Sequence, residues 1–145
     1  MRITKSVFII LLLFLSLSCG KNNNESVNEN LSLNEQIDQY IENNDYETAL
    51  TLLEKQDRED PEVKTLLEKT HLNYGLHSMG TFDAGEMRTR MNNALVQFTE
   101  VLKINPDNRV AREQIEQIMS VYSTMSDRSP DPEVLEGLRE IGMNY

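Results

Sequence analysis

The clearest hydrophobic pattern in the chain lies in residues 94–108. Four apolar positions there are spaced to share one face of a helix: Ala94, Leu95, Phe98 and Leu102. Pro106 then ends the helix, because it has no backbone N–H and disfavours helical geometry at the residue before it. The next two residues, Asp107 and Asn108, are both suited to cap a following helix.

The same spacing occurs earlier in the chain. From Ala49 to Pro61 is 12 residues, as it is from Ala94 to Pro106. The spacing of a leucine to a tyrosine also recurs: Leu33 to Tyr40 and Leu67 to Tyr74 are both 7 residues. Matching offsets at several kinds of position indicate an internal repeat of two helices.

These offsets resemble the tetratricopeptide repeat, which has an aromatic residue on its first helix, then A-x3-F and a closing proline on its second. The segments NNDYETALTLL and NALVQFTEVLKINPDN carry the likeness. Pro61 and Pro106 are 45 residues apart, against about 34 for the family. The excess of 11 residues falls within 76–93, as a loop insertion or as a longer first helix.

The resemblance implies an all-α fold, a short tetratricopeptide-like stack of antiparallel helical hairpins over residues 31–145. Repeats are expected over about 31–61 and 62–106, with a partial third unit over 107–126 and a capping helix over 131–142. Helices are predicted over residues 32–43, 46–55, 107–125 and 131–142. A further helix starts near Pro61, with Gly75 or, preferably, Gly80 as its end, and another starts near Ala84.

Residues 1–18 have the features of a secretory signal peptide: basic Arg2 and Lys5, a short apolar run and small residues before Cys19. The end of this segment resembles a bacterial lipobox, which implies that Cys19 becomes a lipid-anchored N-terminus carrying acyl chains such as palmitate. The alternative is an ordinary signal peptide with an incidental cysteine. Residues 19–30 are polar and rich in asparagine, and we expect a disordered tether.

The chain has 14 basic and 24 acidic residues, a net charge of −10. An acidic domain is repelled by phosphate backbones, so we expect no nucleic-acid partner. The charge favours a basic protein partner, with solubility as the alternative explanation. We read the methionines of the helical region as packing residues in preference to a methionine-rich binding face.

No pattern of catalytic residues, metal ligands or cofactor-binding residues is present. His71 and His77 are six residues apart, which does not place them on one helix face as a metal pair, and we expect both at the surface or its boundary. Phosphate-binding loops of the GxxxxGK type are absent from the sequence. We therefore expect a protein that is not an enzyme and uses no metal or cofactor.

Carried over from the family, the partner-binding groove would be lined by first helices. The expected groove residues are Asn34, Asp38, Ile41, Thr65, Glu68, Leu72, Leu76, Val110, Glu113, Gln117 and Val121. Acids around exposed aliphatic side chains would suit a basic or amphipathic segment of another protein. The alternative is that Leu72 and Leu76 pack against the insertion or against the next repeat.

The expected function is a membrane-tethered protein–protein interaction module, a non-catalytic adaptor or assembly factor in the bacterial cell envelope. It would face the periplasm or the cell surface, and Gly20 in place of an aspartate after the cysteine favours the outer membrane. One alternative is a self-associating structural envelope lipoprotein, and another is an envelope hydrolase.

Overall fold

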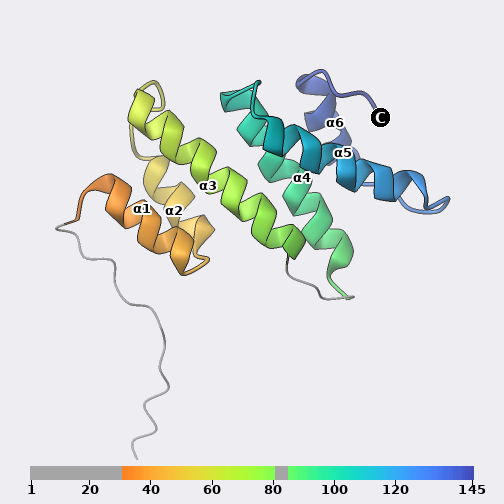
Figure 1. The fold of residues 1–145 in the computed structure, drawn as a ribbon, viewed down its shortest axis with the longest axis horizontal. Helices are drawn as coiled ribbons and strands as arrows, with labels where there is room; N and C mark the ends of the chain where they lie inside the picture. The colour runs from red at the N-terminus through yellow and green to blue at the C-terminus, as the bar shows by residue number, and fades with distance from the viewer. Residues whose placement is uncertain (1–30, 81–84) are drawn as a thin grey trace, which may run out of the picture.

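The computed structural model describes residues 31–80 and 85–145, which form six α-helices and no β-strand (Figure 1). They are α1 (Leu33–Glu42), α2 (Tyr46–Leu53), α3 (Pro61–Gly80), α4 (Met87–Ile104), α5 (Arg109–Ser123) and α6 (Pro132–Glu140). The all-α prediction is therefore confirmed, while the tetratricopeptide-like stack stays a prediction. The expected signal peptide (1–18) and the tether (19–30), with Cys19, lie outside the described residues.

Three helices begin at a side chain that caps free backbone N–H groups. Ser32 and Glu35 form a capping box, in which the Glu35 carboxylate accepts from the Ser32 N–H at 2.9 Å. Asp45 caps α2, and Asn108 caps α5 by accepting from the N–H of Ala111 at 2.9 Å. Of the two cap candidates before α5, the structure therefore uses Asn108.

The residue before α6, Asp131, serves a different purpose. Its side chain makes no cap hydrogen bond and instead accepts from Arg88 at 2.5 Å and from Asn92 at 2.7 Å. The Asn92 side chain in turn accepts from the Asp131 N–H at 3.1 Å. These contacts join the start of α6 to the first turns of α4.

Helices that follow one another along the chain pack together from α1 to α5, and α3 and α4 share the most extensive contact. Helix α1 also contacts α3, and α6 contacts α4. In Figure 1, α3 crosses the molecule between the α1–α2 pair and the later helices. Because α3 lies between two neighbours, it supplies Leu66 and Leu67 to one core and Leu72 and Met79 to the other.

The first core is formed where α1, α2 and the first half of α3 meet. Its buried members are Ile37, Ala49, Leu53, Val63, Leu66 and Leu67. Ile104, from the end of α4, packs against this cluster and links it to the rest of the molecule. A fully buried aliphatic side chain contributes roughly 1.5–3 kcal/mol, so this small cluster is enough to hold α1 and α2 on α3.

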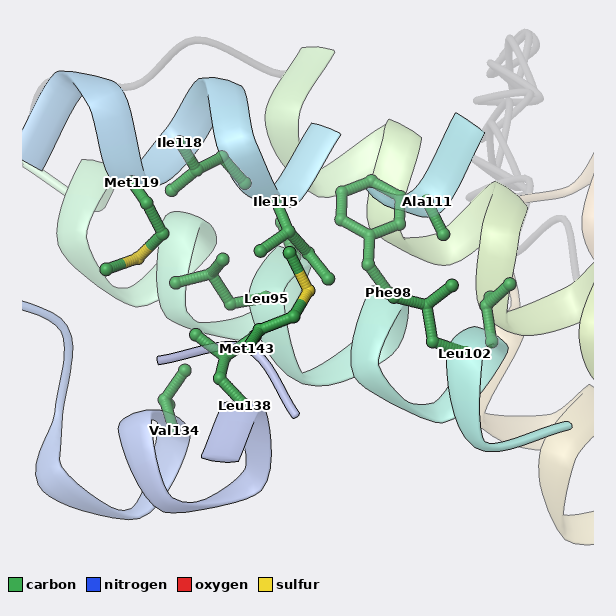
Figure 2. Close-up of a cluster of buried hydrophobic side chains, with 12 residues drawn as sticks. Leu95, Phe98, Leu102, Ala111, Ile115, Ile118, Met119, Val134, Leu138 and Met143 are labelled. Carbon is green, nitrogen blue, oxygen red and sulfur yellow. The ribbon is translucent and has the colours of Figure 1, made fainter. Parts of the chain in front are cut away.

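The second core is larger and joins α4, α5 and α6. Figure 2 shows side chains from the three helices pointing toward one another. The buried members are Ala94, Leu95, Phe98, Val101, Leu102, Ala111, Ile115, Ile118, Met119, Val134, Leu138 and Met143. Val134 and Leu138 attach α6 to this core, so α6 covers the apolar side of α4.

The structure resolves how the extra residues of the second unit are used. Helix α3 continues through Gly75 to Gly80 and has 20 residues, and α4 begins at Met87 and has 18. Gly75 as a possible end of α3 is therefore wrong, and Gly80 is the end. The expected start of α4 near Ala84 moves to Met87, while the other helix ends lie within two residues of the predicted ones.

Candidate functional site

The groove residues expected from α1 lie in different environments. Asp38 makes an ion pair with Lys69 of α3, with 2.5 Å between Oδ1 and Nζ. Ile41 packs against the first core, and Asn34 is exposed. The acid proposed to attract a basic partner is thus already neutralised by a lysine of the same chain.

Glu68 is also engaged inside the fold. Its Oε1 accepts from the side-chain amides of Asn105 at 2.8 Å and Asn108 at 2.7 Å. Asn108 simultaneously caps α5, so Glu68 connects α3 to the turn between α4 and α5. The side chain is partly buried, and its contacts define a structural role.

The remaining expected groove residues are distributed over several environments. Thr65 donates to the carbonyl of Pro61 at 2.8 Å, and Glu113 forms an ion pair with Arg109 at 3.4 Å. Leu72 packs against the second core, as the alternative interpretation foresaw, while Leu76 and Val110 are exposed. Gln117 and Val121 remain, and these two line a groove.

That groove lies between the ends of α3 and α5 and the start of α4, with a volume of about 740 Å³. We call it the methionine groove. Its apolar lining comes from Met79, Met87, Met91, Ile118, Val121, Tyr122 and Met125. Val121 is 50% exposed and Met87 is 38% exposed, so apolar surface faces solvent.

The structure divides the methionines into two groups. Met119 is buried in the second core, and Met79 and Met91 pack against it, as the packing interpretation expected. Met143 is also buried in this core. The four methionines of the groove are not fully buried, and Met87 is the most open of them. The sequence signal for this face is the pair Met87 and Met91, one helical turn apart. The sequence pattern alone had favoured packing in the core for both residues.

Charged side chains stand at the mouth of the methionine groove. Arg88 pairs with Asp131 at the start of α6, while Arg128 and Asp127 form no ion pair among the described residues. The Arg128 guanidinium, which forms no ion pair among the described residues, thus lies beside apolar surface. In a chain of net charge −10, the residues that line this groove include two arginines, Arg88 and Arg128, and one acid, Asp127.

A second cavity, which we call the aromatic pocket, lies between the start of α2, the end of α3 and the first turns of α4. Its volume is about 490 Å³. Tyr46 and Tyr74 stack with ring centroids 4.9 Å apart and planes 9° apart, and His77 lies 5.5 Å from Tyr46. Sequence reasoning missed this pocket because the two tyrosines belong to different predicted repeats.

A chain of polar side chains runs along the interface of α3 and α4. The His71 Nδ1 lies 2.7 Å from the Gln97 oxygen, the Gln97 amide donates to Asn93 at 3.1 Å, and the Asn93 amide donates to Ser78 at 2.8 Å. His71 is buried, which corrects the expectation of a surface position. Burial is the main cause that lowers its pKa, against the hydrogen bond to Gln97, which raises it.

Within residues 31–80 and 85–145, no three His, Cys, Asp or Glu side chains are grouped so that they could hold a metal ion. Two of the described serines donate to backbone carbonyls: Ser78 donates to the carbonyl of Tyr74 and Ser123 to that of Ser120. The buried His71 contacts Gln97 and has no serine partner.

Comparison with known proteins gives no family, curated protein or solved structure that matches the chain. None of the helices in the described part of the chain is both long and apolar enough to cross a membrane.

Proposed function

We propose that this protein is a membrane-tethered protein–protein interaction module, a non-catalytic adaptor or assembly factor of the bacterial cell envelope. In this proposal Cys19 carries the lipid anchor, residues 19–30 are the tether, and the helical domain captures the partner. The observation that carries the proposal is the methionine groove, an open apolar groove of about 740 Å³ on an otherwise acidic chain.

Methionine suits a surface that must accept a partner. Its unbranched side chain and polarizable sulfur adapt to differently shaped apolar groups at small cost. Met79, Met87 and Met91 line one wall from α3 and α4. Val121 of α5 and Met125, which follows the end of α5, line the other. Two helical walls with an apolar floor are the usual receptor for the apolar face of a third helix.

The occupant we propose is an amphipathic helix of a partner protein, with aliphatic or aromatic side chains on one face and a carboxylate placed to meet Arg128. This charge complementarity follows from the mouth of the groove, where Arg128 has no ion-pair partner among the described residues. A purely basic partner has less support, because Asp38 is paired with Lys69 and Glu68 holds the turn before α5.

The experiment is site-specific photocrosslinking of the full-length, C-terminally tagged protein in its membrane. A photoreactive residue replaces Val121 in the groove, and the matched control replaces Val110, which is comparably exposed but does not line the groove. The expected result is one discrete partner peptide from Val121 only, with apolar residues at i, i+3, i+4 and i+7.

A synthetic copy of that peptide then tests the contact directly. We expect Val121→Glu to weaken its binding at least about tenfold, because the substitution puts a charge beside the buried apolar face, and Val110→Glu to leave it unchanged. Crosslinks from Val121 to a second copy of this protein would favour the self-associating lipoprotein over the adaptor. If Val121 and Val110 crosslinked equally to the same partner peptide, the methionine groove would not be the binding site.

A further inference from the structure

We propose that the aromatic pocket binds an organic cation on an alkyl stem, the ammonium or guanidinium of a free polyamine or of a lysine or arginine side chain. This site is separate from the methionine groove and does not depend on the function proposed for it. The argument uses the pocket's volume, its stacked tyrosines and the balance of charge on its walls.

One wall of the pocket is aromatic. Tyr46 is almost fully buried and lies parallel to Tyr74, which leaves the half-buried Tyr74 as the ring that the pocket can offer to a ligand. An aromatic ring attracts a cation through the negative potential of its face. Its flat surface also packs well against the methylene groups of an alkyl stem.

Acidic side chains also line the pocket. Asp45, Glu47 and Glu86 line the pocket, and Arg90 is the arginine among its lining residues. Arg90 is bound to Glu86, with 2.7 Å between Nη2 and Oε2, so these two charges cancel. Neither Asp45 nor Glu47 takes part in an ion pair within the described residues.

The two uncompensated carboxylates are held close to the aromatic wall. The Tyr74 hydroxyl donates to Glu47 Oε1 at 3.4 Å, and Asp45 is fixed by capping α2. Burial, followed by the charge of Glu47, raises the pKa of Tyr74. A ligand that brings a positive charge into this pocket would be stabilised by both carboxylates and by the ring.

The probe is butylguanidinium, titrated into isotope-labelled full-length protein in detergent micelles while amide resonances are followed by NMR. Butylurea has a similar shape without the charge and is the matched ligand control. We expect saturable shifts at residues 44–47 with butylguanidinium and no comparable shifts with butylurea. Equal binding of both compounds would overturn the proposal, because shape alone would then explain it.

Charge-removing variants test the carboxylates without disturbing the fold. Asp45→Asn keeps a helix cap, and Glu47→Gln keeps an acceptor for Tyr74. The double variant is expected to bind butylguanidinium about tenfold more weakly, since both charges next to the ring are lost. The control, Glu116→Gln with Glu133→Gln, changes the net charge equally on exposed positions away from the pocket and should leave binding unchanged. If both double variants bound butylguanidinium more weakly by the same factor, the proposed role of Asp45 and Glu47 would be wrong.

Agmatine and the capped peptide Gly-Arg-Gly distinguish the two sources of the cation. Binding of the peptide would assign the pocket to an arginine of a partner protein, and binding of agmatine alone would assign it to free polyamines. Failure of both compounds to shift residues 44–47 would overturn the proposal. Because all readouts are local to the aromatic pocket, they are independent of crosslinking at Val121.

Discussion

The ring of Phe98 occupies the place that a side chain on Gly75 would need. A Cβ at position 75 would lie 2.5 Å from Phe98 Cε1, well inside van der Waals contact. Phe98 is fully buried in the second core and cannot move aside without displacing its neighbours. The close approach of α3 to α4 therefore requires glycine at this point.

We expect Gly75→Ala to destabilise the protein by about 1–3 kcal/mol, the usual cost of overpacking a core. The substitution also brings a gain of about 1 kcal/mol in helix propensity, which the overpacking must exceed. The measurement is urea unfolding followed by circular dichroism.

The matched control for this variant is Gly137→Ala in α6. A Cβ there meets Thr99 Cγ2 at 3.7 Å, an ordinary contact, so the free energy of unfolding should stay the same or rise by up to about 1 kcal/mol. If Gly75→Ala also stabilised the protein, the close packing of Phe98 on α3 would be contradicted.

The burial of His71 predicts a loss of stability in mild acid. Burial lowers its pKa below the ordinary value of 6.5 that it regains on unfolding. The unfolded state therefore binds the proton more readily, so the stabilisation present above pH 6.5 is lost as the pH falls toward the lowered pKa. Chemical unfolding at a series of pH values between 8 and 5, on an approximate one-unit grid, would measure this slope.

Substitution tests whether this slope belongs to His71. His71→Gln cannot titrate, and we expect its free energy of unfolding to vary less with pH than that of the native protein. An unchanged slope in His71→Gln would assign the acid sensitivity to other groups.

Glu68 is predicted to stabilise the fold through the turn between α4 and α5. We expect Glu68→Ala to lower the free energy of unfolding by about 1–3 kcal/mol, because two side-chain amides lose a charged acceptor. Glu68→Gln retains an acceptor and should cost less. Urea titration of both variants measures the difference.

A contrasting variant comes from the exposed ion pair of Asp38 with Lys69. Asp38→Asn should change stability by about 0–1 kcal/mol, since exposed pairs contribute little. If Asp38→Asn lowered the free energy of unfolding by more than Glu68→Ala, the structure's prediction that Glu68 contributes more to stability than Asp38 would be wrong.

The proposed lipid anchor gives a prediction at the other end of the chain. Cys19→Ser should abolish incorporation of a labelled fatty acid and release the processed protein from the membrane fraction, because the anchor is the buried acyl chains. Metabolic labelling and fractionation measure the two effects. Cys19→Ser protein that remained membrane-bound after cleavage of residues 1–18 would contradict this anchor.

Local patterns determined much of the helical architecture. Apolar spacing identified the face of α4 that carries Ala94, Leu95 and Phe98, and all three are fully buried. Capping chemistry placed the starts of α1 and α5, because Ser32 and Asn108 act within one turn of their own helix. Such signals are readable from sequence because the residues that interact are neighbours along the chain.

Contacts between distant segments were decided by the tertiary structure alone. The stack of Tyr46 on Tyr74, the bonds from Glu68 to Asn105 and Asn108, and the burial of His71 against Gln97 all join residues far apart in sequence. The physical reason is that helix periodicity defines which face is apolar, while the angle and depth at which helices pack select each residue's partner. The sequence therefore determined the helices of this protein, and the packing determined where its groove and its pocket lie.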